Sequence, residues 1–540
     1  MFRETISKRP PALSFECLAA DSLKPKDGTA VVARDMRLDP FSDALREKHS
    51  KFLAKKSSVL GLPIDGKSDN RTFSLLKSIH RYLGLHRTDT AWVLREWIPN
   101  VKGVYMMGDF NQWDRHSHPL TKLPVEQFGE DVWSITLEHG SNREEVLRHK
   151  MKYKLHIVTH SDQEIDRVPP SASVVWKSED GNEVYDAAVW HPPKTECHEF
   201  QHAAPSRPER PKIYEAYVGF SSHQMRFGTY NEFRTDVLPR IHRLGYNALV
   251  LVGVPEHSLT SVGWEVTNFL APASSFGTPE ELKALIDEAH KFGIYVILSI
   301  IHSHSSASTA AGLNEIEGGD GGFFKSGTSG THPQWNCRLF DYSKPEVCRF
   351  LMSQLSCFMD LYKIDGFRFE GLTSMLYHHH GVGRDFRDYN DLGRYFSFEV
   401  NDEASAYLML VNDFIHSISP KKNHVLTIGT DHSRMPILAH DLSEGGLGFD
   451  YRMAPHIADE WIRQLCHSDD IFIEMSSIVN TLEIRSPLEK TIAASETLAN
   501  SLRSRRTLKV AMFAWESLHT HAVGGVAPHV TELAAGLARL

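Results

Sequence analysis

The chain has 540 residues, of which 41% are hydrophobic and 24% charged, and its formal net charge is −9. This length exceeds that of one ordinary domain and indicates several. The acidic balance argues against a general nucleic-acid or anionic-membrane partner, whereas a neutral ligand needs no charge match. No run of about 18 or more apolar residues is present, so no transmembrane helix is expected.

The six cysteines are scattered along the chain without metal-ligand spacing or the density of a disulfide scaffold. We interpret them as free thiols of a reducing compartment. The first residues also lack the apolar core of a signal peptide. Together these features predict a cytoplasmic protein.

Residues 1–85 are expected to form an N-terminal extension with helices. From Phe41 to about Leu83, apolar residues recur at roughly helical spacing. The Lys- and Arg-rich opposite face is typical of a solvated helix surface. The region before it, with Pro10, Pro11 and Pro25, predicts little order.

Residues 86–195 contain short alternating segments separated by turn residues such as Pro99-Asn100 and Gly108-Asp109. The runs DVWSITLE and HKMKYKLHIVTH continue this pattern. Short strands at such spacing predict a small β-sandwich. A proline-rich linker follows it.

Residues 210–500 alternate apolar strands with amphipathic helices, which predicts a (β/α)8 TIM-type barrel. The strands are apolar on both faces, as a parallel sheet covered by helices requires. The expected strands are KIYEAYV, ALVLVGV, YVILSII, IDGFRF and HVLTIGT, and two of the expected helices are PEELKALIDEAHKFG and EVCRFLMSQLSCFMDLY.

The pattern of residues 507–540 predicts a strand, a Gly-Gly turn and a helix. The basic, linker-like segment SLRSRRTLK leads into them. The change of pattern near Ser501 predicts that the barrel ends there, without its last unit. The C-terminal segment is then expected to form a separate βα unit.

The string DGFRFE places Glu370 two residues after Arg368, where an apolar strand ends. With GTHPQWNCRLFDYSKPEVCRFL and GLGFDYRMAPHIADEWI, it resembles the eukaryotic-type 1,4-α-glucan (glycogen or starch) branching enzymes of the α-amylase superfamily. This similarity is dense over residues 210–500. The resemblance implies an α-glucan partner, retaining transfer from α-1,4 to α-1,6 linkages in glycogen or starch metabolism, and no cofactor.

The resemblance also implies three catalytic carboxylates, of which a retaining enzyme uses two as nucleophile and acid/base. The nucleophile position holds Glu370 where the family has Asp, and misplacement by about 1 Å can cost a hundredfold in rate. The acid/base position holds Thr430, whose hydroxyl cannot protonate a leaving group near neutral pH. Asp431 is a possible substitute, but neighbouring residues on a strand point to opposite faces.

The third catalytic segment reads SETLAN and places Leu498 and Ala499 where the family has His and Asp. Ser299 similarly replaces an Asp of the first barrel motif. One carboxylate is therefore changed in length and two are missing. Because losses in a cooperating set cost many powers of ten in rate, we expect a catalytically degenerate pseudoenzyme.

Several residues fall at positions that the resemblance assigns to substrate binding. In the barrel these are Arg368, His304 and Trp264. The segment REWIPNVKGVYMMGDFNQWD resembles the starch-binding-type module of branching enzymes, where aromatic rings stack on glucose. Its candidates are Trp97 and Trp113, with Lys122 nearby, and a core role is the alternative for each Trp.

Two histidine groups, His378-His379-His380 and the pair His302 and His304, have the composition of metal ligands. Both groups also occur in the branching-enzyme pattern without a catalytic metal. We therefore expect no metal at these positions.

The segment VAMFAWESLHTHAVGGVAPHVTEL resembles the first strand, loop and helix of glycogen/starch-synthase-type glycosyltransferases. Its loop contains Gly524-Gly525. The resemblance implies a glycosyltransferase domain or partner, although about 30 residues cannot complete a nucleotide site.

Three functions follow from these observations. The preferred one is a non-catalytic α-glucan-binding scaffold that accompanies a synthase. The second is an active branching enzyme that uses Glu370 as nucleophile and Asp431 or Glu496 as acid. The third is a decayed, truncated domain whose incomplete barrel leaves sheet edges unpaired.

Overall fold

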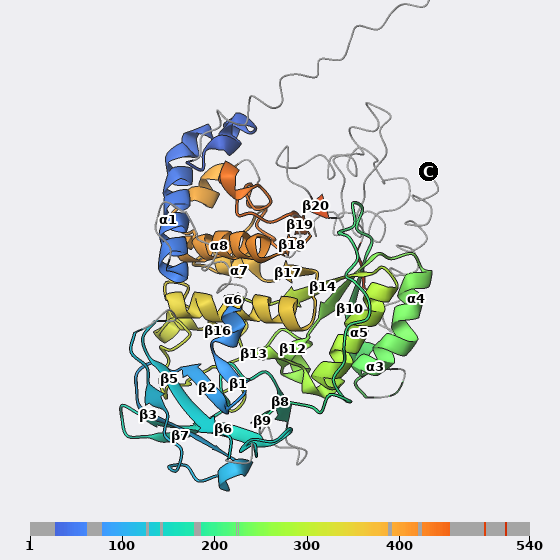
Figure 1. Ribbon diagram of the computed structural model, residues 1–540. Coiled ribbons are helices and arrows are strands. Elements are labelled where there is room, and N and C mark those ends of the chain that lie inside the picture. The colour runs from blue at the N-terminus through green and yellow to red at the C-terminus, as the bar shows by residue number, and fades with distance from the viewer. Residues whose placement is uncertain are drawn as a thin grey trace, which may run out of the picture.

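The computed structural model describes residues 27–61, 78–125, 129–140, 144–177, 185–222, 224, 226–386, 391–419, 424–453, 491–492 and 513–515. Within these residues an N-terminal helix is followed by two antiparallel sheets and then by a curled parallel sheet with helices around it (Figure 1). This order confirms the expected β-sandwich and TIM-type barrel.

Helix α1 (Ser42–Leu60) begins where the periodicity predicts and ends at Gly61, whose φ of 65° lies in the left-handed region that glycine adopts readily. The rest of the expected helical region, residues 62–77, lies outside the described residues. Helix α1 packs against α8 (Asp402–Ile418) and α6 (Pro345–Leu361), as its position in Figure 1 shows.

The lysines of α1 do not form the solvated face that the pattern predicts. The Lys48 side chain is buried. Lys51 pairs with Asp402 at 2.6 Å and Lys55 with Glu403 at 2.5 Å, both on α8. The prediction was wrong because the α8 carboxylates make this face a contact between two helices.

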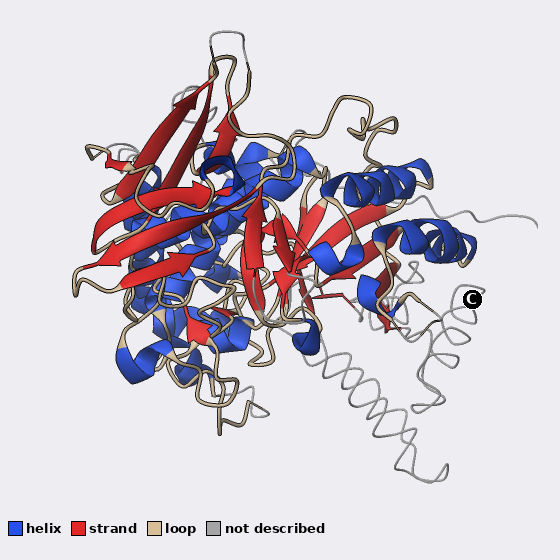
Figure 2. Cartoon of the chain, turned by 90° about the horizontal axis from the view of Figure 1, so that it is seen from below, coloured by secondary structure: helices blue, strands red, loops and turns tan. Residues whose placement is uncertain are grey.

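The β-sandwich consists of a four-stranded sheet in the order β1-β2-β5-β4 and a second sheet in the order β3-β6-β9-β8, with β7 on β6. All the pairs are antiparallel, and Figure 2 shows these strands grouped on one side of the barrel. The strands are β1 Gly84–Arg87, β2 Ala91–Trp97, β3 Val101–Gly108, β4 Thr121–Lys122, β5 Val132–Glu138, β6 Lys152–Thr159, β7 Glu164–Arg167, β8 Val175–Lys177 and β9 Tyr185–Ala188.

The barrel sheet is parallel throughout, in the order β20-β19-β18-β17-β14-β11-β10-β21. The five strands expected from sequence are confirmed as β10, β11, β14, β17 and β18. Their residues are buried almost throughout because helices cover one face and barrel side chains fill the other. The strands are β10 Ile213–Tyr217, β11 Ala248–Val252, β14 Tyr295–Ile300, β17 Gly366–Phe369, β18 Leu426–Gly429, β19 Tyr451–Met453, β20 Thr491–Ile492 and β21 Phe513–Trp515.

The eighth strand, β21, comes from the segment that the sequence assigns to a separate βα unit. It pairs in parallel with β10, with Ile213 opposite Phe513. The sheet thus has a strand at the position that was expected to be missing. The loop with Gly524-Gly525 lies outside the described residues, so its relation to a glycosyltransferase stays a prediction.

The remaining helices cover the barrel, and two further sheets of two antiparallel strands accompany it. These two-stranded sheets are β12 Pro255–His257 with β13 Val266–Pro272, and β15 His304–Ser305 with β16 Arg338–Leu339. The helices are α3 Tyr230–Glu232, α4 Leu238–Arg243, α5 Pro279–Lys291 and α7 Leu372–Leu376, and a π-helical stretch, Phe233–Val237, joins α3 to α4.

In the part of the chain that the structure describes, no helix is both long and apolar enough to cross a bilayer. Four of the cysteines lie in this part, and all four are free thiols. Cys337, Cys348 and Cys357 are buried, whereas Cys197 is exposed.

Candidate functional site

Glu370 directly follows β17, at the carboxyl edge of the barrel sheet, where barrel enzymes place their chemistry. Its backbone N–H donates to the carbonyl of Ile300 at 3.0 Å, which continues the ladder between β17 and β14. The side chain is buried, and its Oε1 accepts a hydrogen bond of 3.0 Å from the Ser299 hydroxyl. The same oxygen forms an ion pair with Arg368 Nε.

Arg368 lies between two carboxylates inside the barrel. Its two terminal nitrogens donate to Glu215 on β10 at 2.6 and 2.8 Å, while Nε faces Glu370. Burial alone would lower the pKa of this guanidinium, but the charges of Glu370 and Glu215 outweigh it and raise the pKa above its usual value. The cation therefore stays charged and holds both carboxylates in place.

Thr430 follows β18, the strand beside β17, and its backbone N–H donates to the Phe369 carbonyl at 2.9 Å. The structure thus brings Thr430 and Glu370 to neighbouring strand ends, as the sequence predicts. The Thr430 hydroxyl is buried and has no hydrogen-bond partner. A hydroxyl without a base beside it supplies neither an acid nor a base near neutral pH.

Asp431 is buried in the loop that follows β18. Its Oδ1 accepts from the Thr373 hydroxyl at 2.9 Å and from the Ser433 hydroxyl at 2.7 Å. Its Oδ2 accepts from the backbone N–H of Met435 at 3.0 Å. Both carboxylate oxygens are therefore occupied in holding the loop. Glu496, Leu498 and Ala499 lie outside the described residues.

His304, the first residue of β15, contacts Trp264 in the loop between β12 and β13. His304 Nε2 donates to the Trp264 carbonyl at 3.0 Å, and Nδ1 accepts from the Ser303 hydroxyl at 2.8 Å. Burial lowers the pKa of His304 to about 4, so the ring is neutral. Both ring nitrogens have protein partners, whereas the Trp264 side chain is 47% exposed.

A polar cavity of about 370 Å³ beside these two-stranded sheets was not found by sequence reasoning. Trp335 is 45% exposed and stacks on His332, with ring centroids 3.8 Å apart. An exposed ring beside hydroxyls and a carboxylate suits a sugar, which offers both C–H and O–H groups. The lining includes Ser258, Thr260, Glu265, Thr267, Trp335 and Asn336.

The β-sandwich candidates differ in accessibility. Trp97 is 5% exposed and packs edge-on against Phe323 at 4.8 Å, so it has no free face for a sugar, and the structure supports the core role. Trp113 is partly exposed, and its indole N–H donates to Asp109 at 3.0 Å. Lys122 is exposed and pairs with Asp131.

The histidine groups noted in the sequence have ordinary protein contacts. His302 is fully buried, and its ring bonds to Gln354 and to the Tyr407 hydroxyl, each at 2.8 Å. His380 bonds to the Ser374 carbonyl at 2.9 Å. Among the described residues, the group whose donor atoms lie close enough to share an ion lies elsewhere, in the β-sandwich.

Two family matches agree with this architecture. Residues 82–172 match carbohydrate-binding module 48 (isoamylase N-terminal domain), and residues 225–317 match the alpha amylase catalytic domain. The fold is also similar to the crystal structure of a candidate alpha amylase from Salmonella typhimurium, with a TM-score of 0.52 and 15% identity, over 72% of this chain and 56% of that one. The fold and site therefore define a protein with an α-amylase-type barrel behind a carbohydrate-binding module.

Curated relatives narrow this class. The chain is 41% identical to the 1,4-alpha-glucan-branching enzyme of Yarrowia lipolytica over 479 residues, which are 87% of this chain and 68% of that one. It is 39% identical to that of Emericella nidulans, over 90% of this chain and 69% of that one. It is 38% identical to the enzyme of Equus caballus, over 88% of this chain and 65% of that one. The chain belongs to the 1,4-alpha-glucan-branching enzyme family, and it spans about two thirds of the length of these relatives.

Proposed function

We propose that this branching-enzyme-like protein of glycogen metabolism binds α-glucan without transferring it. The observation that carries the proposal is the Thr430 hydroxyl, which stands without a hydrogen-bond partner at the strand end beside Glu370. Retaining transfer needs a carboxylic acid there to protonate the leaving oxygen. The nearest replacement, Asp431, has both oxygens bound, by Thr373 of α7 and by Ser433 and Met435 of its own loop.

The environment of Glu370 supports a structural role for its carboxylate. Oε1 interacts with both the Ser299 hydroxyl and Arg368 Nε. An ion pair with Arg is compatible with a nucleophile, but the longer side chain places the reactive oxygen differently from that of Asp, and such displacements cost about a hundredfold per ångström. Glu370 then serves mainly to neutralise Arg368.

Glucan binding has separate support. The exposed ring of Trp335 lines a cavity with many hydroxyl groups, Trp264 is also exposed, and the matched carbohydrate-binding module precedes the barrel. The relatives are named for an α-1,4-glucan reaction. Trp113 and Lys122 add a second candidate surface on the sandwich. A glycosyltransferase domain or partner is part of the proposal and rests on residues 507–540 alone.

The deciding experiment incubates the purified chain with amylose and analyses chain lengths after enzymatic debranching. We expect no new short chains, and no difference between the unmodified protein and Glu370→Gln. New branches that disappear in Glu370→Gln would show an active enzyme instead, and the proposal would fail.

Binding is measured on the same preparation by retardation in a glycogen-containing native gel. We expect retardation that weakens about tenfold in Trp335→Ala, because the variant removes the apolar ring face that sugar C–H groups would contact, and tenfold corresponds to about 1.4 kcal/mol of binding free energy. Met36→Ala is the matched control, because it also removes an exposed apolar side chain but at a position far from Trp335 in the sequence. Absence of retardation in the unmodified protein would contradict glucan binding.

A further inference from the structure

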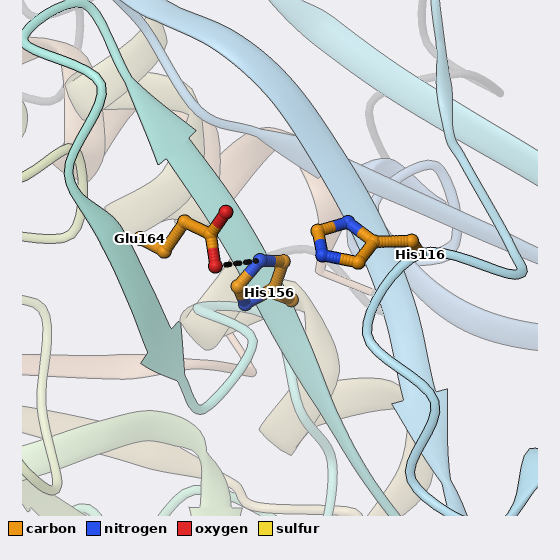
Figure 3. A group of neighbouring side chains, drawn as sticks. All are labelled: His116, His156 and Glu164. Atoms are coloured by element: carbon orange, nitrogen blue, oxygen red, sulfur yellow. Dashed lines mark ion pairs between the residues drawn. The ribbon is translucent and has the colours of Figure 1, made fainter.

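We propose a divalent transition-metal site in the β-sandwich, formed by His116, His156 and Glu164 (Figure 3). Their donor atoms all lie within 4.8 Å of one another. The group is separate from the barrel residues described above, and two imidazoles with one carboxylate form a donor set typical of Zn²⁺.

The sheet places His156 and Glu164 on one face. His156 on β6 is opposite Asp166 on β7, and Glu164 is opposite Val158. Residues two apart on a strand share a face, so the side chains of His156, Glu164 and Asp166 project to the same side. The distance from His156 Nε2 to Glu164 Oε2 is 3.6 Å. Two ligand atoms on one tetrahedral zinc ion lie about 3.3–3.5 Å apart, so this pair is nearly in place.

The tautomer of His156 suits a ligand. Nδ1 lies 2.8 Å from Asp166 Oδ1 and donates its proton to that carboxylate, which leaves the lone pair on Nε2. His156 is 1% exposed, and its Nε2 has no hydrogen-bond partner. Metal-bound histidines almost always donate their other N–H to a carboxylate or carbonyl, which fixes the ring and strengthens the donor.

His116 completes the group from the loop between β3 and β4. Figure 3 shows its ring projecting toward His156, and the two ring centroids lie 5.1 Å apart at 90°. Both His116 and Glu164 are exposed, so side-chain rotation can shorten the remaining separations. The site then ties the loop that carries Trp113 to strands β6 and β7.

The local charges favour a cation. Asp166 and Glu164 supply two negative charges, and Arg115, which pairs with Asp166 at 2.7 Å, supplies one positive charge. The balance before metal binding is therefore −1 with neutral histidines. Imidazole donors favour Zn²⁺, Co²⁺, Ni²⁺ or Cu²⁺ over the oxygen-seeking Mg²⁺ and Ca²⁺. Three protein ligands leave the fourth position of a tetrahedral ion to water.

The test is titration of chelator-treated full-length protein with Zn²⁺ by calorimetry, and with Co²⁺ by visible absorption. We expect one tight equivalent of Zn²⁺ and the d–d spectrum of tetrahedral Co²⁺. His116→Ala and Glu164→Gln each remove one exposed ligand, so each should weaken the tight equivalent at least about tenfold.

His160→Ala is the matched control, because His160 is exposed at the end of the same strand but outside the group. It should leave the affinity and the Co²⁺ spectrum unchanged. Circular dichroism of every variant verifies the fold. Absence of a tight equivalent, or equal affinity in the unmodified protein, His116→Ala and Glu164→Gln, would overturn the site. A loss in His160→Ala as large as that in His116→Ala would do the same, since it would indicate scattered surface binding.

Discussion

The carboxyl group of Glu96, on β2, lies inside the β-sandwich and accepts hydrogen bonds from one backbone N–H. It is fully buried, and the backbone N–H of Ser171 lies 3.2 and 3.3 Å from its two oxygens. Burial raises the pKa of Glu96 to about 8, against the smaller lowering effect of Ser171. Because the folded pKa lies above the unfolded value, Glu96 contributes stability that is complete below about pH 4.5 and lost as the pH rises through about 8.

Replacing Glu96 by Gln should remove this pH dependence. In urea titrations at pH 5, 7 and 8.5, the free energy of unfolding of Glu96→Gln relative to the unmodified protein should rise by a few kcal/mol between the lowest and the highest pH. Glu256, whose pKa burial raises to about 7, contributes in the same direction in both proteins, so the difference isolates Glu96. The exposed Glu138→Gln is the control, and identical slopes in Glu96→Gln and the unmodified protein would contradict the prediction.

Arg368 neutralises two carboxylates inside the barrel, the buried Glu370 and the partly buried Glu215. Arg368→Met should lower the free energy of unfolding by about 3–5 kcal/mol, because the buried Glu370 and the partly buried Glu215 would lose their cation. Glu370→Gln should cost less, since Arg368 keeps both hydrogen bonds to Glu215. Denaturant unfolding at pH 7 measures both losses. Arg226 forms an ion pair with Glu232 at the surface, so Arg226→Met is the control and should cost below about 1 kcal/mol. Equal losses at Arg368 and Arg226 would show that the barrel cation is dispensable.

At the scale of elements, α5 illustrates how local sequence sets a boundary. Thr278 precedes Pro279, and its hydroxyl accepts from the Glu281 backbone N–H at 3.2 Å while the Glu281 carboxylate accepts from the Thr278 N–H at 2.7 Å. This reciprocal capping satisfies two donors at the start of the helix. Thr278→Ala should therefore lower the free energy of unfolding by about 1 kcal/mol in urea titration.

Thr235→Ala is the matched control for the cap, since Thr235 is exposed and its hydroxyl bonds only within its own helical stretch and to Asp236. It should change stability by less than about 0.5 kcal/mol. A Thr278→Ala loss no larger than the Thr235→Ala loss would mean that packing alone positions α5.

Elements with strong local patterns could be predicted from the sequence, and those set by distant contacts could not. Strand β17 is apolar apart from Arg368, and Glu370 and Thr430 meet because adjacent parallel strands end at one edge. The hydrogen bond from the Ser299 hydroxyl to the Glu370 carboxylate depends on the register between β14 and β17, which the sequence does not display. His116, His156 and Glu164 come from a loop and two strands, so no short motif marks them. Trp335 appears in sequence as one aromatic residue of a polar loop, and its exposure follows only from the fold.

At the scale of the molecule, aromatic contacts join the β-sandwich to the barrel. Trp97 at the end of β2 packs on Phe323, and Phe323 packs on Phe350 of α6 at 4.9 Å. Further links include Trp190 with Glu280 and His198 with Asp287. A buried aromatic bridge of this kind predicts that the two parts unfold together.

Trp97→Ala should break this bridge. The loss of a large buried ring costs about 3–5 kcal/mol, and the effect should concentrate on the contact between the two parts. Differential scanning calorimetry should then show the single transition of the unmodified protein separating into two, with the β-sandwich melting first because it loses its buried neighbour. Trp113→Ala, which removes a partly exposed ring from the same sandwich, should preserve one transition. If Trp97→Ala also melts in one transition at an unchanged temperature, Trp97 does not couple the sandwich to the barrel.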